Sequence, residues 1–279
     1  MRLDFKQIDK VVLNALEEDM PYGDVTTDSL IPDEDTTEAF FIAKADGVIA
    51  GIPVAKRVFE LIDSRISMEI RKSDGERAAK GDIIAVLNGP TAAILKGERT
   101  ALNLLQRLSG IATRTNVFTE LVKGYNVSVA DTRKTTPGLR YLEKYAVRCG
   151  GGRNHRFSLS DAVMLKDNHI AAAGGIKAAV SRVRENIPHT VKIEVEVEDM
   201  GMVREAVEAK ADIIMLDNMT EPAMAEAVSY INGRALVEAS GDVTEERIRA
   251  IAETGVDIIS IGRITHSVKA MDISLRFKI

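Results

Sequence analysis

The sequence predicts an α/β protein of two parts, in which an antiparallel sheet with helices precedes a barrel of βα units or an open relative of one. Two observations lead to this fold class. Apolar runs of strand length recur in the second half with helical patterns between them, and this alternation is typical of a parallel sheet. The chain also has 279 residues, which suits one large domain joined to a smaller one.

The elements of the second half follow from the spacing of its apolar residues. Several of the runs are apolar on both faces, as buried parallel strands are. The expected strands are residues 127–130, 162–165, 191–197, 212–216, 235–239 and 257–261, and the expected helices include 202–209, 222–231 and 244–254. At least six such units in about 150 residues suggest a barrel or an open relative of one.

The first hundred residues have a different pattern. Residues 5–19 have the apolar spacing of a helix, and a second helix is expected near residues 53–62. Short apolar runs, separated by Gly, Pro or Asp, predict an antiparallel sheet at residues 39–45, 47–51, 66–70 and 83–87. The longest helical pattern, residues 98–121, leads into the second domain.

Composition and charge exclude several classes of protein. The residues are 45% hydrophobic and 28% charged, and the net charge of −5 argues against a nucleic-acid binder. The longest uncharged stretch has 13 residues (83–95), which is shorter than the roughly 20 apolar residues of a membrane span. The first 20 residues have no apolar signal core. Because Cys149 is the one cysteine, no intrachain disulfide can form, and a cytoplasmic protein is expected.

Positive charge is concentrated in one part of the chain. Residues 131–170 carry eight Lys or Arg against four Asp or Glu, whereas the rest of the chain is acidic. A basic segment at strand ends predicts a pocket for an anionic small molecule. A solvated helix face is an adequate alternative for the basic residues of 140–148. It explains Arg133, Lys134 and Lys166 less well, because these residues follow apolar strands directly.

Nearly every predicted strand of the second half ends in ionisable or phosphate-binding residues. In a βα barrel, the carboxyl ends of the strands build the active site. In chain order, the residues at these ends are Asp131-Thr132-Arg133-Lys134, Lys166-Asp167-Asn168-His169, Glu194 with Glu196, Asp217-Asn218, Glu238 with Ser240-Gly241, and Gly262-Arg263. Each pattern alone is weak evidence, but the full set predicts an active site.

The last two units suggest a phosphate site. Ser240 and Gly241 precede a predicted helix, and Gly262 follows the final strand. Small residues let backbone N–H groups approach a phosphate, and a helix N-terminus adds partial positive charge. The final strands of a barrel are also the usual phosphate site. Glycines that only shape tight turns are the alternative, but two adjacent loops favour phosphate.

Two glutamates interrupt a predicted buried strand. Glu194 and Glu196 are two residues apart, so both side chains should point into the barrel. Buried carboxylates need partners. Glu196 and Asp217, on adjacent strands, can hold ribose hydroxyls or Mg²⁺ through oxygen ligands. An internal ion pair with Lys166 or Lys192 is the alternative, and for Glu194 the two interpretations are about equal.

The roles of the lysine and histidine residues are open from the sequence alone. A barrel lysine such as Lys166 can form a Schiff base, but Arg133 and Arg156 nearby favour a point charge for an anion. His155 lies in a glycine-rich loop at residues 150–156 that can be mobile, and a surface histidine is its alternative. The four histidines share no metal-ligand spacing, so no zinc site is expected.

Eight segments, in order along nearly the whole chain, resemble the quinolinate phosphoribosyltransferase family. The longest is residues 98–113 (ERTALNLLQRLSGIAT). The others are residues 17–27 (EEDMPYGDVTT), 131–137 (DTRKTTP), 151–155 (GGRNH), 165–169 (LKDNH), 194–198 (EVEVE), 238–241 (EASG) and 265–267 (THS). Several long motifs in one order are far more specific than a single short pattern.

The resemblance implies an N-terminal α/β sandwich domain, residues 1–105, which the C-terminal residues 272–279 can join. It implies an open α/β barrel of about seven strands, residues 106–271. The implied enzyme is a phosphoribosyltransferase that works as a homodimer or higher homo-oligomer and requires Mg²⁺. It would transfer phosphoribosyl from phosphoribosyl pyrophosphate to quinolinate with decarboxylation. The products would be nicotinate mononucleotide, pyrophosphate and CO₂, in de novo NAD biosynthesis.

The resemblance also assigns roles by matching motifs. Quinolinate would be bound by Arg133, His155, Arg156 and Lys166, with Arg99 of the partner subunit reaching in. Lys134 and Thr135 would lie near pyrophosphate or substrate, and Glu196 and Asp217 would face the ribose hydroxyls and Mg²⁺, directly or through water. The 5-phosphate would be held by Ser240, Gly241, Asp242, Ile261, Gly262 and Arg263. The catalytic residues would be Lys134, Lys166, Glu196 and Asp217.

Some details of the sequence leave alternatives open. Asp242 and Arg263 depart from the residues expected in the phosphate loops, so they can pair with each other, or Arg263 can contact phosphate. A related phosphoribosyltransferase for another base, a non-catalytic metabolite sensor and a lysine-dependent aldolase are rival functions. Arg99 and the DTRKT, NHR and KDNH segments favour a dicarboxylate substrate, and Glu196 and Asp217 argue against a sensor.

Overall fold

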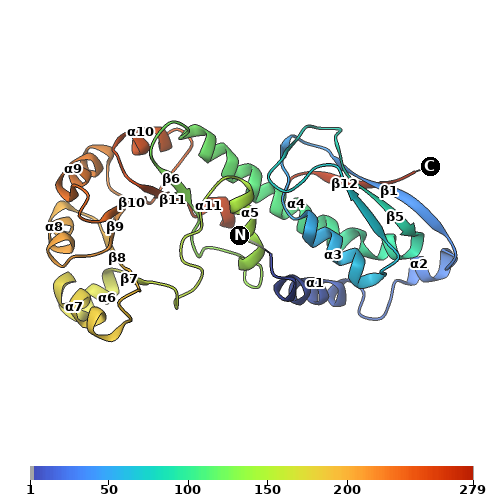
Figure 1. The fold of residues 1–279 in the computed structure, drawn as a ribbon, viewed down its shortest axis with the longest axis horizontal. Coiled ribbons are helices and arrows are strands. Elements are labelled where there is room, and N and C mark those ends of the chain that lie inside the picture. The colour runs from blue at the N-terminus through green and yellow to red at the C-terminus, as the bar shows by residue number, and fades with distance from the viewer. Residues whose placement is uncertain (1–2, 279) are drawn as a thin grey trace. The chain divides into compact units, whose positions relative to one another are not determined.

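The computed structural model describes residues 3–278 and divides the chain into two compact units (Figure 1). The first unit takes the chain as far as Asn116, together with Thr135–Gly151 and the chain from Arg263 onward. The second unit comprises Val117–Lys134 and Gly152–Gly262. The domain boundary expected between residues 105 and 106 falls inside helix α4 (Thr91–Leu121), which is continuous through that point.

An antiparallel sheet of four strands forms the centre of the first unit. Its strands are β1 (Thr36–Ala43), β3 (Ser67–Ile70), β5 (Ile83–Pro90) and β12 (Ile273–Phe277). The order is β12-β1-β5-β3, so the strand nearest the C-terminus pairs with β1 in the N-terminal sheet. The strands β2 (Gly47–Val48) and β4 (Arg77–Ala78) make a separate short pair.

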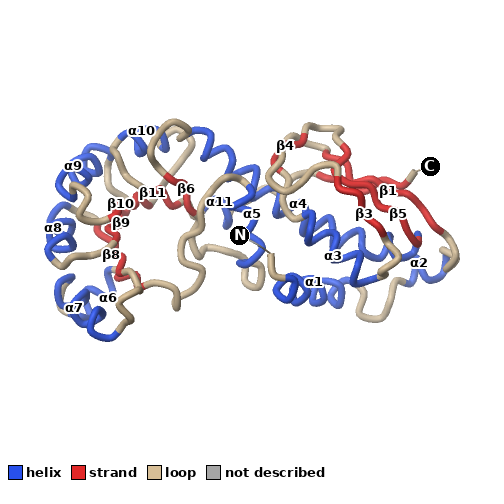
Figure 2. The backbone as a smooth tube through the Cα atoms, in the orientation of Figure 1, coloured by secondary structure: helices blue, strands red, loops and turns tan. Residues whose placement is uncertain are grey.

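Helices cover this sheet, as Figure 2 shows for α3 and α4. The helices of the unit are α1 (Phe5–Asp19), α2 (Val25–Leu30), α3 (Ile52–Ile62), α4, α5 (Arg140–Cys149) and α11 (Arg263–His266). Phe41 of β1 packs against Phe59 of α3, with ring centroids 6.1 Å apart, and both side chains are buried. Arg57 of α3 pairs with Asp9 of α1 at 2.7 Å. The apolar face of α3 is therefore fixed against the sheet.

The second unit is built on a parallel sheet. Its strands are β6 (Ser128–Ala130), β7 (Val163–Leu165), β8 (Ile193–Val197), β9 (Ile213–Asp217), β10 (Leu236–Ser240) and β11 (Ile258–Ser260). The order β6-β11-β10-β9-β8-β7 leaves β6 and β7 at the two ends, so the barrel is open. Six strands are described where about seven were expected, and a single bridge between Ala130 and Arg153 adds to the edge at β6.

The two faces of this parallel sheet differ in character. Val195, Ile214 and Leu216 are fully buried and apolar, and they alternate with inward residues such as Glu194 and Glu196. The helices lie along the outer side of the curved sheet in Figure 1. They are α6 (Asp167–Ala173), α7 (Ile176–Asn186), α8 (Met200–Glu208), α9 (Glu221–Ile231) and α10 (Ile248–Glu253). The predicted α/β fold class, with an antiparallel part and a barrel-like parallel part, is confirmed.

The helices in residues 3–278 include none that combines the length and apolar character needed to cross a membrane.

One close approach in the first unit gives a stability prediction. Gly110 lies in α4, where a Cβ atom would come within 2.4 Å of the Lys269 carbonyl oxygen. Replacing glycine by alanine in an open helix stabilises it by up to about 1 kcal/mol. Here the clash with the backbone should reverse the sign, and Gly110→Ala should lower the free energy of unfolding by about 1–3 kcal/mol.

The measurement is urea denaturation, with Asn103→Ala, at an exposed position of the same helix, as the matched control. The control should be neutral or slightly stabilising, because alanine has the higher helix propensity. A Gly110→Ala protein as stable as the unchanged chain would contradict the close packing of α4 against residues 268–270.

Candidate active site

The carboxyl ends of the parallel strands surround a cavity of about 350 Å³ within the second unit. Eight of the residues predicted from the sequence line it, namely Arg133, Lys134, His155, Arg156, Lys166, Glu196, Asp217 and Ser240. The lining also contains Thr132, Met164, Met215, Glu238 and Ser260. The cavity therefore brings several basic side chains together with carboxylates and hydroxyls.

The additional lining residues follow a regular spacing in the sequence. Met164 and Lys166 are two residues apart, and so are Met215 and Asp217 on the neighbouring strand β9. Residues two apart in a strand share a face. Glu238 and Ser240 of β10 repeat this spacing, although the sequence alone indicates no role for Glu238. Counting back two residues from each polar strand end would have found it and both methionines.

Lys166 lies between β7 and α6 and forms an ion pair with Glu196. Its Nζ donates a hydrogen bond to Glu196 Oε2. The backbone N–H of Lys166 donates to Nδ1 of His169 at 3.1 Å, which fixes the start of α6. The internal ion pair with Lys166, which was the alternative for these carboxylates, is therefore found at Glu196 and not at Glu194.

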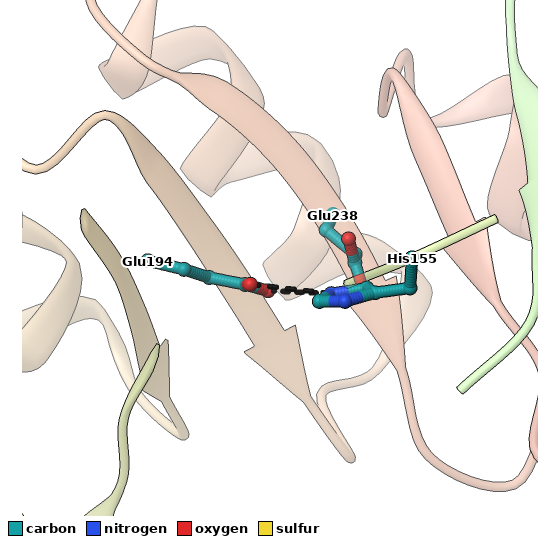
Figure 3. A group of neighbouring side chains, drawn as sticks. All are labelled: His155, Glu194 and Glu238. Carbon is teal, nitrogen blue, oxygen red and sulfur yellow. Dashed lines mark hydrogen bonds and ion pairs between the residues drawn. The ribbon is translucent and has the colours of Figure 1, made fainter. Parts of the chain in front are cut away.

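Glu194 pairs instead with His155, and Glu238 joins them (Figure 3). The Nε2 atom of His155 lies 3.2 Å from Glu194 Oε2 and 3.5 Å from Glu238 Oε1. Glu194 and Glu238 are 2% and 1% exposed, and the imidazole is largely buried between them. The alternative that His155 is a surface loop histidine is therefore wrong.

The charges of this cluster shift the pKa of both partners. Burial lowers the pKa of His155, but hydrogen bonds and attraction from Glu194 and Glu238 outweigh it and raise the pKa to about 10. Nδ1 accepts a hydrogen bond from the Arg156 N–H at 2.7 Å. Only the neutral ring can accept this bond, so the bond counteracts the effect of the carboxylates on the pKa of His155. The two buried negative charges dominate. Burial raises the pKa of Glu194, and the Glu238 charge adds to this effect while His155 counteracts it.

The segment that carries His155 is anchored to β6 despite its glycines. Asp131 is fully buried, and its carboxylate accepts hydrogen bonds from Asn154 Nδ2 at 2.6 Å and from His155 N at 2.8 Å. The backbone of Arg153 bonds to Val129 on β6 and to Asp131, the residue directly after β6. These bonds hold the histidine in place at the cavity wall.

Arg156 is held near a second arginine. Its guanidinium donates to the Ala162 carbonyl oxygen at 3.0 Å and contacts Met164 Sδ at 3.4 Å. Burial lowers the pKa of Arg156, and repulsion from the nearby Arg133 charge lowers it further. Two arginines that repel each other beside a cavity form a site for an anion, whose charge would relieve the repulsion.

The carboxyl ends of β9 and β10 lie side by side in the same lining. Ser240 is in register with Asp217. Gly241 and Asp242 follow with φ angles of +89° and +40°, a sharp turn that glycine readily adopts. The carbonyl oxygen of Asp242 accepts from Arg247 Nη1 at 2.9 Å.

The other predicted site residues do not line the cavity. Arg99, Thr135 and Arg263 belong to the first unit. Ile261 is buried, and its N–H donates to the Ala130 carbonyl oxygen, so its contribution is structural in this arrangement. The remaining ones, Gly241, Asp242 and Gly262, follow β10 and β11.

Two sets of side chains offer possible metal ligands. Within the described residues, His155, Glu194 and Glu238 place one ligand atom each within 4.8 Å of one another. In this set, Nε2 of His155 already forms ion pairs with both Glu194 and Glu238. Glu196 and Asp217 line the cavity from adjacent strands and offer only oxygen atoms, the ligand type that Mg²⁺ prefers.

The buried histidine gives a prediction about pH. The charge of His155 contributes stability that is complete below about pH 6.5 and is lost as the pH rises through about 10, because the folded pKa is raised. Glu238→Gln removes one of the two carboxylates and should lower the pKa of His155 by about one unit or more. NMR titration of the histidine ring signals measures this shift.

The matched control is Glu198→Gln, which removes a nearby exposed carboxylate beyond the end of β8. It should leave the His155 titration unchanged. An identical His155 pKa in the unchanged chain and in Glu238→Gln would mean that the two groups do not interact as the geometry indicates.

Family models match nearly the whole chain. Residues 24–109 match the quinolinate phosphoribosyl transferase N-terminal domain, and residues 111–276 match its C-terminal domain. The chain is 46% identical over 269 residues to the probable carboxylating nicotinate-nucleotide pyrophosphorylase of Bacillus subtilis, covering 96% of this chain and 93% of that protein. A protein of the same description from Archaeoglobus fulgidus is 49% identical, with 92% and 99% covered.

Solved structures of two further proteins are also similar to this chain. The crystal structure of NadC from Streptococcus pyogenes is 41% identical and superposes with a TM-score of 0.96, with 100% of both chains covered. The nicotinate-nucleotide pyrophosphorylase structure from Francisella tularensis is 40% identical with a TM-score of 0.96, covering 99% of this chain and 98% of that one. The chain therefore belongs to the quinolinate phosphoribosyltransferase family, as the eight sequence motifs predicted.

Proposed function

We propose that this chain is a carboxylating nicotinate-nucleotide diphosphorylase. It transfers the phosphoribosyl group of phosphoribosyl pyrophosphate to quinolinate and releases pyrophosphate and CO₂. The product, nicotinate mononucleotide, is a precursor in de novo NAD biosynthesis. The observation that carries this proposal is one cavity with basic residues, Arg133, Lys134, Arg156 and Lys166, and with the carboxylates Glu196 and Asp217.

Quinolinate carries two carboxylates, and the basic end of the cavity suits them. Arg133, Arg156 and Lys166 supply fixed charges for both groups. The ring of His155 lies between Glu194 and Glu238, so in this proposal His155 supports this end of the cavity through its positive charge rather than by direct contact with the substrate. Arg99 of the partner subunit completes the site in a homodimer or higher homo-oligomer.

The donor substrate occupies the other end in this proposal. Ser240 and Gly241, with Asp242, Gly262 and Arg263 around the last two strands, hold the 5-phosphate, and Ile261 supports the last strand end through its bond to Ala130. Lys134, with Thr135 beside it, attracts the pyrophosphate. Glu196 and Asp217 accept hydrogen bonds from the ribose hydroxyls. Glu196 and Asp217 also fit Mg²⁺, because they are the oxygen-only carboxylate pair of the cavity.

Catalysis follows from positioning and electrostatics. Bound Mg²⁺ would neutralise charge on the departing pyrophosphate. Positive charge that develops at C1 of the ribose is stabilised by Glu196 and Asp217 as the pyridine nitrogen attacks C1. The bonded ring nitrogen is cationic, so it stabilises the electron pair left on C2 when the adjacent carboxylate leaves as CO₂. A proton then bonds to C2.

Lys166 acts by charge rather than as a nucleophile in this proposal. Its Nζ forms an ion pair with the Glu196 carboxylate, and Lys166 lines the same cavity as Arg133 and Arg156, a setting that suits a fixed charge for an anion better than a Schiff-base nucleophile. This pairing favours phosphoribosyl transfer over an aldolase reaction.

The test is product formation by the purified protein with quinolinate, phosphoribosyl pyrophosphate and Mg²⁺. Nicotinate mononucleotide and CO₂ should form in equal amounts only in the complete mixture. Nicotinate in place of quinolinate should give little product, because it has one carboxylate instead of two and leaves some of the basic residues of the cavity without a partner. No product from a folded sample would favour another base as substrate, or a sensor.

The basic end gives a prediction on turnover. Lys166→Ala and Arg133→Ala should each lower kcat/KM, because truncating one member of a charge pair costs about 2–5 kcal/mol, or roughly 30- to 4,000-fold. Steady-state kinetics measure the loss, and circular dichroism checks the fold. Arg182→Ala, at an exposed position of α7, is the control and should keep full activity. Near-normal turnover in either site variant would overturn its assignment.

A further inference from the structure

Asn218 follows β9 in an unusual backbone conformation. Its φ angle is +54°, in the left-handed region that few side chains adopt, although asparagine is tolerated there. Asn232, at the end of α9, has a similar φ of +45°. A tight turn explains Asn232, because its N–H bonds the preceding helical turn. Asn218 has in addition a set of contacts at the edge of the cavity.

The contacts of Asn218 join two strand ends. Its Nδ2 donates to Asp217 Oδ2 at 2.9 Å, and its backbone N–H donates to the Ser240 carbonyl oxygen at 3.0 Å. A Cβ atom at Gly241 would lie 2.1 Å from Asn218 Oδ1 and 2.6 Å from Cγ. The side chain of Asn218 therefore packs directly over Gly241 while it orients the Asp217 carboxylate.

The contacts of Asn218 connect two parts of the site, Asp217 and the Ser240–Gly241 turn, that would bind the same substrate. In the proposed function, Asp217 faces the ribose hydroxyls and Ser240 with Gly241 hold the 5-phosphate. The ribose hydroxyls and the 5-phosphate belong to one ribose 5-phosphate group. The distance and direction from the Asp217 carboxylate to the Ser240–Gly241 turn therefore have to match those from the hydroxyls to the phosphate. The amide hydrogen bond to Oδ2 sets the orientation of the carboxylate and leaves Oδ1 for a ligand.

We propose that Asn218 is a positioning residue that determines affinity for the phosphorylated pentose by orienting Asp217 relative to the Ser240–Gly241 turn. It acts through Asp217 rather than by contact with the reacting atoms. Quinolinate binds at the basic end, so its affinity is independent of Asn218. This inference rests on the proposed function and deepens it.

The main variant is Asn218→Gly. Glycine adopts a positive φ without strain, so this change removes the side chain and keeps the backbone turn and its bond to Ser240. Asn232→Gly is the matched control, because it makes the same replacement at a left-handed position outside the cavity lining. Thermal denaturation of both variants checks that the fold is retained.

Two readouts test the effect of the side chain. Calorimetry measures the binding of ribose 5-phosphate with and without Mg²⁺, and steady-state kinetics give KM for each substrate. Losing a residue that orients a ligating carboxylate costs about 10- to 100-fold. Asn218→Gly should weaken ribose 5-phosphate binding and raise KM for phosphoribosyl pyrophosphate by this factor. KM for quinolinate, and all values for Asn232→Gly, should stay unchanged.

A double-mutant cycle tests whether the effect passes through Asp217. Ribose 5-phosphate affinity is measured for Asp217→Asn alone and combined with Asn218→Gly. If Asn218 acts through the carboxylate, the second change should add little to the first. Fully additive losses, or an Asn218→Gly protein with unchanged affinity, would overturn the inference while the proposed function stands. An unchanged chain that binds no ribose 5-phosphate and forms no product would overturn both.

Discussion

The alternation of side chains along the parallel strands is the constraint on which the site depends. Outward positions such as Val195 and Ile214 are apolar because they lie beneath the helices, and their burial holds the strands in register. The inward positions are then free to carry polar groups. Glu196 and Asp217 thus occupy neighbouring positions at one edge, as the ends of adjacent parallel strands must. The chemistry of the cavity is a consequence of how its walls are packed.

Placing so much positive charge in one cavity requires counter-charges inside the protein. A buried charge without a partner costs several kcal/mol. Glu194 and Glu238 meet this requirement around His155, and Glu196 does so for Lys166. His155 and Lys166 are thus each held by carboxylates, and Arg156 is held by the Ala162 carbonyl oxygen, so an anionic substrate meets side chains that are already oriented. That arrangement reduces the reorganisation needed when substrate binds.

The order of the helices and strands could be predicted from the sequence, but the pairs that side chains form in the folded protein could not. All six predicted strands of the barrel were found within a few residues, because apolar runs and intervening helical patterns are local signals. The pairing of Glu194 with His155 could not be predicted, because the two residues approach only after the loop from Asp131 is anchored to β6. The grouping of α5 with the first unit likewise depends on tertiary contacts that no local pattern reports.

The same distinction explains which kind of residue was missed at the site. Residues that carry charge, such as Arg133 and Lys166, stand out in a sequence because charge directly after an apolar strand is uncommon. Asn218 stands among the polar residues at the strand ends, but it is neutral and next to a more conspicuous aspartate, so its residue type assigns it no role. Its importance lies in a positive φ angle and in the space that Gly241 leaves for it, which are properties of the folded backbone. Groups that orient a catalytic carboxylate are therefore found from geometry, whereas the carboxylate itself is found from the sequence.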